Sequence, residues 1–146
     1  MNIVTYPNKI LEKKTKKVKN PLDPKIQKLI KDMLETMEKK GGAGLAAPQV
    51  GESFRICVLQ FEEEIFILIN PKITSYSRDK EIGEEGCLSF PGKFIPVKRS
   101  AKIKARYLNE KGGEMKIKAE GMLARIIQHE VDHLDGILFT KRTKIK

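Results

Sequence analysis

Apolar residues in the segment 26–37 recur at every third or fourth position. This spacing places on one face of an α-helix the residues Ile26, Leu29, Ile30, Met33, Leu34 and Met37. Asp23 is suited to the N-cap, Pro24 to the first helical position and Gly41-Gly42 to the end of the helix. The pattern predicts one amphipathic helix that packs through this face, with its methionines in the core.

The middle of the chain carries short apolar runs instead of a helical pattern. Two runs, 54–59 and 65–69, flank the acidic triplet 62–64 and predict a β-hairpin. Further strand candidates, separated by turn-forming residues, are 73–77, 94–97, 103–108 and 115–119. The segment 120–134 returns to helical spacing. A helix, a series of strands and a second helix predict a single α+β domain over residues 1–146.

Composition narrows the class of protein. The 146 residues, 40% of them hydrophobic, suffice for one core, and no stretch approaches the roughly 20 apolar residues that span a bilayer. The start of the chain does not resemble a secretion signal. Two cysteines are too few for a disulfide framework, so we expect the cytoplasm or an equivalent reducing compartment, with Cys57 in the core.

The formal net charge of +10 would attract nucleic acid or other polyanions. The lysines are scattered along the chain, tryptophan is absent and no nucleic-acid-binding motif is present. A solvated, lysine-rich surface is therefore the preferred interpretation, and proximity to RNA is the functional alternative.

The clearest chemical signal is the sequence His129-Glu130-Val131-Asp132-His133 in the second predicted helix. Positions i and i+4 share one face of a helix, so both imidazoles can bind one metal ion. Glu130 directly follows the first histidine, where a general base could reach a water molecule beside the metal. An exposed, metal-free histidine pair is the alternative. Both histidines of the chain belong to the motif, which favours the metal.

A catalytic site of this kind needs a third protein ligand. The candidates are the carboxylates and Cys87, whose thiolate would suit zinc or ferrous iron and which could also be a plain reduced thiol in a loop. The glycine-rich segment 42–50 lacks the residues of a phosphate-binding loop. It is either a helix stop and turn, or a loop along which a peptide backbone can bind while Gln49 donates a hydrogen bond to an oxyanion.

Three segments in this order resemble the motifs of the peptide deformylase family. Residues 42–49 match a Gly-x-Gly-Leu-Ala-Ala-x-Gln motif, 85–89 match Glu-Gly-Cys-Leu-Ser, and 128–136 match Gln-His-Glu-x-Asp-His-Leu-x-Gly. The Tyr6-Pro7 opening and the hairpin extend the resemblance over nearly the whole chain. The resemblance implies antiparallel strands wrapped around a central metal-binding helix that carries the HExxH motif.

The activity that the resemblance implies is hydrolysis of the N-formyl group from the formyl-methionine of nascent polypeptides, with release of formate. The implied metal ligands are Cys87, His129 and His133, with Fe²⁺ as the native ion and Zn²⁺ or Ni²⁺ as alternatives. The implied catalytic groups are Glu130 for the proton, and Gln49 and the Leu88 backbone N–H for the oxyanion. The implied substrate-binding residues are Ala43, Gly44, Gly86, Met122 and Ile126.

Two features depart from the family pattern. Arg125 occupies a position that can be apolar in the family, so it either narrows the methionine pocket or lines it with its aliphatic stem. The residues after Phe139 are too few for the C-terminal helix implicated in ribosome docking, so this is expected to be a short form. We therefore expect formyl-methionyl peptides as partners, the ribosome or nascent chain only through diffuse positive charge, and neither a membrane nor sequence-specific nucleic acid.

Other classes of protein share part of this pattern. An HExxH metallopeptidase would need a downstream carboxylate or histidine as its third ligand, and only Asp135 follows His133. A basic RNA-binding module with a structural metal would need a fourth ligand, and Cys57 is the remaining thiol. An inactive relative would have lost part of the catalytic set, and all of that set is present.

Overall fold

Helix α1 (Pro24–Lys40) forms where the spacing of apolar residues predicts it. The computed structural model describes residues 1–142, and in it the Asp23 side chain accepts a hydrogen bond of 2.9 Å from the Lys25 backbone N–H. Gly41 ends the helix in the left-handed conformation, at φ 67°. The buried face of α1 packs against the first two strands and contributes to one of two hydrophobic clusters.

A five-stranded antiparallel sheet has the strand order β1-β2-β3-β6-β7. Its strands are β1 (Gly44–Ala46), β2 (Ile56–Phe61), β3 (Glu64–Tyr76), β6 (Lys102–Leu108) and β7 (Glu114–Glu120). The expected hairpin is confirmed as β2 and β3. Its turn residues Glu62 and Glu63 have positive φ angles of 49° and 66°, as a two-residue turn of type I′ requires.

The strand expected at 73–77 forms over most of that segment, but as the continuation of β3 and not as a separate strand. Its register with β6 shifts between Ile69 and Lys72, where Asn70 has a φ of 53°. A bulge therefore accommodates the turn-like Asn70-Pro71 pair, and the strand continues past it.

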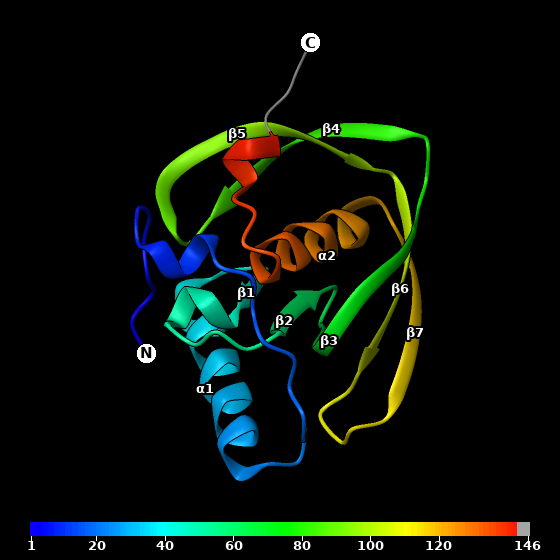
Figure 1. Cartoon of the computed structure of the whole chain (residues 1–146). Coiled ribbons are helices and arrows are strands. Elements are labelled where there is room, and N and C mark those ends of the chain that lie inside the picture. Colours follow the sequence, from blue (N-terminus) through cyan, green and yellow to red (C-terminus); the bar gives the residue numbers. More distant parts are fainter. Residues whose placement is uncertain (143–146) are drawn as a thin grey trace.

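Two further strands, β4 (Lys80–Cys87) and β5 (Phe90–Ser100), form a second antiparallel sheet. This sheet arches over α2 (Gly121–Leu134) on the side opposite the five-stranded sheet (Figure 1). The hydrophobic pattern did not predict β4, and it predicted only 94–97 of β5. Most residues of both strands are exposed, so apolar and polar positions do not alternate clearly.

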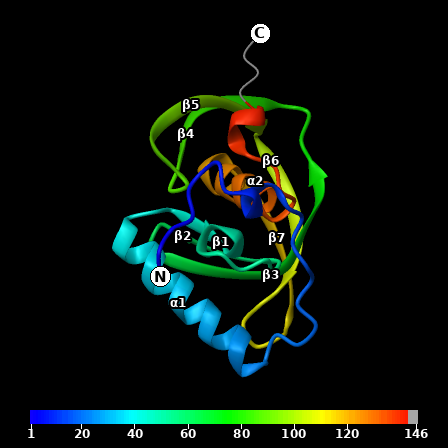
Figure 2. The same cartoon turned by 60° about the vertical axis from the view of Figure 1, so that its left-hand side comes forward.

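Helix α2 lies in the middle of the molecule, between the two sheets (Figure 2). Every residue from 124 to 134 is buried, and the apolar ones form a second hydrophobic cluster with Cys57 of β2. Burial raises the pKa of the Cys57 thiol well above its usual range, as expected for an inert core residue. The predicted α+β fold, with antiparallel strands around a central helix, is confirmed.

The short 3-10 helix η3 (Phe139–Arg142) follows α2. The expectation that no longer helix forms after Phe139 also concerns residues 143–146, which lie outside the described part of the chain. Within that part, no helix combines the length and the apolar character needed to cross a membrane.

Candidate metal centre

The end of β4 meets α2 at a group of three potential metal ligands. One ligand atom each from Cys87, His129 and His133 lies within 4.8 Å of the others. The Cys87 Sγ is 3.3 Å from His133 Nε2, and the two imidazole rings are 5.0 Å apart between centroids. Within residues 1–142 this is the group of His, Cys, Asp and Glu side chains placed to hold a metal ion. Of the candidates for a third ligand, it is the thiol that lies beside the two imidazoles in this group.

An irregularity in the β4–β5 pairing turns Cys87 toward α2. Gly86 pairs with Phe94, whereas Cys87 pairs with Phe90, so the register shifts between the two neighbours. Glycine at position 86 leaves room for the Phe94 ring, because an added Cβ would lie 2.6 Å from it. The ring covers the strand at that point, and the chain bends immediately before the thiol.

Hydrogen bonding fixes the orientation of His129. Its Nδ1 lies 2.8 Å from Glu85 Oε1, which leaves Nε2 as the free ring nitrogen. Burial lowers the pKa of His129, but hydrogen bonds with Cys87 and Glu85 outweigh this effect and raise the pKa to about 10. Burial holds the pKa of His133 well below its usual value, so that imidazole is neutral and available as a ligand. The surroundings of Cys87, His129 and His133 thus stabilise positive charge, and this is what a site for a divalent cation requires.

Glu85 is held by two buried arginines. Arg99 donates from Nε and Nη2 to the two carboxylate oxygens at 2.9 and 3.0 Å, and Arg125 Nη1 donates at 2.7 Å. Burial raises the pKa of Glu85, but hydrogen bonds with His129 and Arg99 lower it to about 2. Arg99 also forms an ion pair with Asp132 of the HExxH motif, so the network around Glu85 connects β5 with α2 beside His129. Sequence reasoning missed this network, because its members are far apart in the chain.

The charged end of Arg125 is held by backbone groups of the second sheet. Its guanidinium also donates to the Val97 and Glu81 carbonyl oxygens at 2.9 and 2.8 Å and lies over Gly83. The charged end is therefore engaged by β4 and β5, and Arg125 is also one of the residues that line the cavity described below.

Replacing Arg125 with methionine is expected to destabilise the protein by about 2 kcal/mol, because Glu85 and two carbonyls lose a charged donor. For a chain of this size the loss corresponds to a melting temperature about 4–8 °C lower in a thermal unfolding experiment. The matched control is Arg78→Met, since Arg78 is exposed. Equal melting temperatures for the two variants would contradict the assigned role of Arg125.

Glu130 is buried beside the ligands. Its Oε1 has no hydrogen-bond partner among the described residues, and burial raises its pKa to about 7. Gly44 of β1 contacts the other oxygen so closely that an added Cβ would lie 2.5 Å from Oε2. A carboxylate with one unpartnered oxygen and a pKa near neutrality is suited to accept and return a proton.

Gly44→Ala is therefore expected to displace the Glu130 carboxylate and to lower kcat by about 100-fold, the typical effect of a misplacement of about 1 Å. The control is Gly113→Ala in the β6–β7 turn, where the atoms nearest to the added Cβ belong to the Asn109 side chain. A crystal structure of the alanine variant would show the shift, and an unchanged kcat would argue against close packing of glycine on the base.

Gln49 lies on the short helix η2 (Ala47–Val50), next to Cys87. Its Oε1 accepts a hydrogen bond from the Ala46 N–H at 3.0 Å, and its Nε2 lies 3.6 Å from Cys87 Sγ and 3.2 Å from Ser89 Oγ. The amide N–H groups are thus directed to the ligand cluster, where an oxyanion would form. Ser89 was not singled out by sequence reasoning, because a single serine in a motif carries no distinctive signal. Its hydroxyl also donates to the Val4 carbonyl oxygen at 2.7 Å.

A cavity of about 860 Å³ opens beside the ligand cluster. Its walls include all five residues expected to bind substrate: Ala43, Gly44, Gly86, Met122 and Ile126. Leu88, Gln49 and Glu130 also line it. The sequence did not indicate that Ile3 and Thr5 of the N-terminal segment or Phe90 and Phe94 of β5 would reach this cavity, because only the tertiary structure brings them there.

A thiol, two imidazoles, a buried carboxylate and an amide beside an apolar cavity define the class of metal-dependent hydrolases. The polypeptide deformylase family model matches residues 1–146. The chain belongs to this family.

Relatives and solved structures agree with this assignment. The chain is 50% identical to the peptide deformylase of Dictyoglomus thermophilum over 133 residues, covering 91% of this chain and 86% of the relative. It is 49% identical to the Clostridium botulinum peptide deformylase, with 99% and 97% covered. The crystal structure of the Thermotoga maritima peptide deformylase matches with a TM-score of 0.95 at 40% identity, covering 99% of this chain and 97% of the other.

Proposed function

We propose that this deformylase holds one divalent metal ion with Cys87, His129 and His133 and uses it to hydrolyse the N-formyl group of formyl-methionyl peptides. The observation that carries the assignment of residues is the group of three ligand atoms within 4.8 Å, next to an unpartnered carboxylate oxygen of Glu130. Fe²⁺ is the proposed native ion, with Zn²⁺ or Ni²⁺ as substitutes, because one thiolate and two imidazoles suit all three.

When bound, the ion supplies Lewis acidity, which lowers the pKa of a water molecule and polarises the formyl carbonyl. Glu130 Oε1 accepts a proton from the attacking water and later donates it to the leaving amine nitrogen. The pKa of about 7 suits both transfers. The carbon–nitrogen bond of the formamide breaks, and the products are formate and a free N-terminus.

The proposed oxyanion donors are the Gln49 amide and the Leu88 backbone N–H. The hydrogen bond from the Ala46 N–H to Gln49 Oε1 fixes which end of the amide points to the ligands. Leu88 directly follows Cys87 and lines the same cavity. Donors held in place before the reaction stabilise the developing charge without a cost of reorientation.

The cavity is the proposed site of the methionine side chain. Met122, Ile126 and Ala43 supply apolar walls, while Gly44 and Gly86 leave room for a peptide backbone. The peptide deformylase of Acinetobacter baumannii, 33% identical and matching with a TM-score of 0.94 over 97% of each chain, was solved with Met-Ala-Ser bound. The Synechococcus elongatus peptide deformylase was solved in complex with actinonin. It is 38% identical to this chain and matches it with a TM-score of 0.95, covering 100% of this chain and 80% of its own.

Residues 1–146 are proposed to act as one catalytic domain in a reducing compartment where translation starts with formyl-methionine. The two hydrophobic clusters share the five-stranded sheet, which supports a single domain. We also propose that the protein associates with the ribosome or nascent chain through the diffuse positive charge of its surface.

The test of the proposed function compares formyl-Met-Ala-Ser with acetyl-Met-Ala-Ser and with an unblocked peptide. We expect formate from the first peptide and no internal cleavage of the third. The second should release little or no acetate, because the extra methyl group of its acetyl group would lie against the proposed oxyanion donors, Gln49 and the Leu88 N–H. Cleavage of internal peptide bonds, or equal rates for formyl and acetyl groups, would contradict the proposal.

A further inference from the structure

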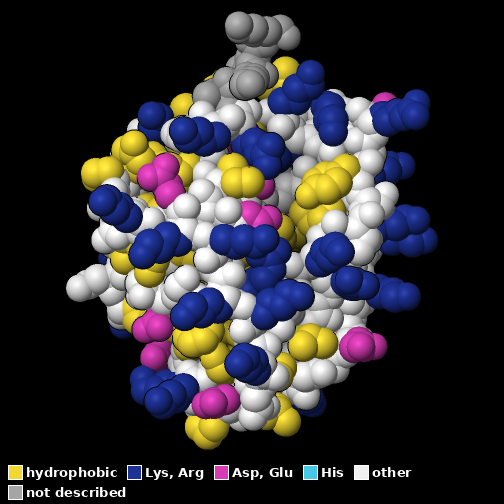
Figure 3. Space-filling view, in the orientation of Figure 1, with side chains coloured by type: hydrophobic (Ala, Val, Ile, Leu, Met, Phe, Trp, Pro, Cys, Tyr) yellow, Lys and Arg dark blue, Asp and Glu magenta, His cyan; other side chains and the backbone are white. Residues whose placement is uncertain are grey.

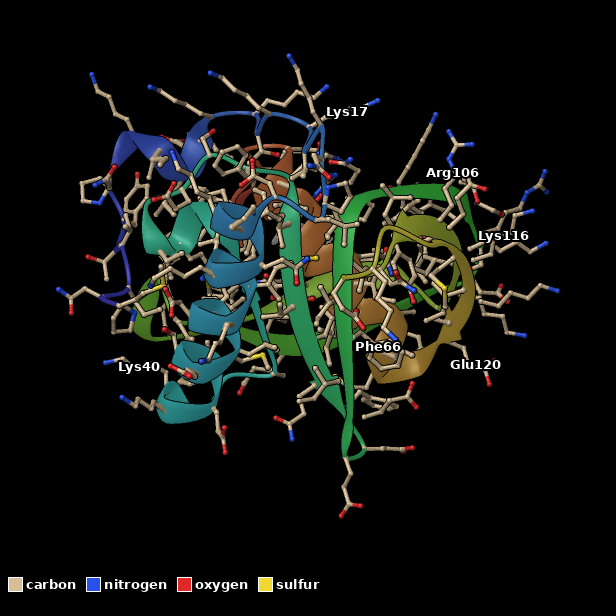
Figure 4. All side chains as sticks on the ribbon, turned by 90° about the horizontal axis from the view of Figure 1, so that it is seen from below. Lys17, Lys40, Phe66, Arg106, Lys116 and Glu120 are labelled. Carbon is tan, nitrogen blue, oxygen red and sulfur yellow. The ribbon has the colours of Figure 1, made fainter. Side chains whose placement is uncertain are left out.

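The outer face of β3, β6 and β7 is strongly basic. Its six exposed cationic residues, referred to below as the basic face, are Lys72, Lys102, Lys104, Arg106, Lys116 and Lys118. Figure 4 shows Arg106 and Lys116 extending outward from the β6–β7 hairpin. In Figure 3, Lys and Arg side chains project along the right-hand edge, where Figure 1 places β6 and β7.

The strand register sets like charges directly against one another. Lys104 is opposite Lys118, and Arg106 lies between Lys116 on one side and Lys72 on the other. Like charges at directly opposite positions destabilise a sheet. Within residues 1–142, the only ion pair of the basic face joins Lys102 to Glu120 at 3.8 Å. The sheet therefore carries a concentration of positive charge that its own structure does not neutralise.

Protection of a sheet edge does not account for this arrangement. Lysines on an edge strand prevent unwanted pairing with another chain, and β7 is an edge strand. The strands β6 and β3 are interior, however, and they carry Lys72, Lys104 and Arg106. Cationic residues on interior strands have no edge to protect.

We propose that the basic face is a sequence-independent docking surface for the phosphate backbone of double-stranded RNA. Alternate residues on a strand are about 6.7 Å apart and neighbouring strands about 4.8 Å apart. The charges thus lie within a Debye length of about 8 Å of one another and act together. A polyanion with closely spaced phosphates engages several at once and releases its counterions.

The composition of the face sets the type of contact. The aromatic residues of β3, β6 and β7 lie on the opposite face, where Phe66 and Tyr107 pack against the second hydrophobic cluster and Tyr76 pairs with the buried Ile103. As a result, the basic face of these three strands offers no ring on which an unpaired base could stack. Contacts are therefore made to the backbone and carry no base sequence information. The choice of RNA rests on the proposed function, because an enzyme that acts on nascent chains works beside ribosomal RNA. The face lies outside the catalytic cavity, whose walls include none of the six residues.

The test measures binding of a labelled 20-base-pair RNA duplex by fluorescence anisotropy over a range of salt concentrations. The face variant carries Lys104→Gln, Arg106→Gln, Lys116→Gln and Lys118→Gln. The control variant loses the same charge elsewhere, through Lys9→Gln, Lys25→Gln, Lys31→Gln and Lys39→Gln, all at exposed positions. Formate release from formyl-Met-Ala-Ser is measured for both, to show that each variant is folded.

We expect the face variant to bind at least about tenfold more weakly. The slope of log K against log salt concentration should become shallower by about 0.9 for each lost phosphate contact, and so by about 3–4 in total. The control should change affinity by less than about twofold, and both variants should release formate at the rate of the unsubstituted protein. Equal weakening in both variants would overturn the proposal, because net charge alone would then explain binding. Binding to vesicles of anionic phospholipid but not to the duplex would overturn it in favour of a membrane surface. The unsubstituted protein could also prove to have no deformylase activity while the face variant still loses RNA binding. That result would support the docking surface and contradict only the proposed function.

Discussion

Glu130→Gln is expected to lower kcat for formate release by about 10³- to 10⁴-fold while leaving the bound metal in place. Glutamine has nearly the same shape but cannot accept a proton from water or return one to the leaving amine. Glu130 is not one of the three clustered ligands, so the metal content should stay the same. The measurement is kcat together with metal per chain by elemental analysis.

The control for this substitution is Glu38→Gln, at an exposed position of α1 that does not line the cavity. It should leave both kcat and metal content unchanged. A Glu130→Gln variant that retained more than about a tenth of the activity would show that another group moves the proton, since general acid–base groups contribute at least 10²-fold.

Cys87→Ala is expected to remove the metal and with it essentially all activity. The Cys87 Sγ is the only thiol ligand of the cluster and lies 3.3 Å from His133 Nε2. Loss of a supporting residue around a metal ligand already weakens metal binding about 10- to 100-fold, so loss of the ligand itself should cost more than 100-fold. Competition with a chromogenic chelator gives the metal affinity.

The matched control is Cys57→Ala, which removes the chain's other thiol from the fully buried position in β2. It should keep one metal per chain and its activity, at some cost in stability. If the Cys57 variant lost the metal and the Cys87 variant kept it, the assignment of the ligand would be wrong.

The two helices could be predicted from the sequence because their signals are local. Asp23 and Gly41 mark the ends of α1, and the apolar spacing of 26–37 and 120–134 fixes the buried faces. The strand β4 could not be predicted, because its residues are mostly exposed and its stability comes from pairing with β5. Likewise, the bulge at Asn70 is a property of the β3–β6 register, which the pattern of one strand does not contain.

The candidate site divides in the same way. The spacing of His129 and His133 on a helix predicts that they share a face, so two candidate ligands follow from sequence alone. The third was left open between Cys87 and the carboxylates, because the approach of β4 to α2 depends on the shift at Gly86. The supporting arginines are bound to Glu85 across 14 and 40 residues of sequence, and nothing local connects them.

Charge shows a further difference between sequence and structure. The sequence suggested scattered lysines and a diffuse positive field, and basic side chains do cover much of the surface in Figure 3. The sheet register additionally places Lys104 against Lys118 and Arg106 against Lys116. That alignment depends on which residues pair across the hairpin, so it emerges only from the fold.

The dependence of deformylation on one bound ion is measured by a metal titration of the metal-free protein, with formate release as the readout. Ferrous or nickel ion would be added without oxygen, with formyl-Met-Ala-Ser as substrate. We predict that activity rises linearly and stops rising at one ion per chain, and that the Cys87→Ala protein stays inactive over the same range. Formate release by protein without metal, or metal bound at one ion per chain without any formate, would contradict the account.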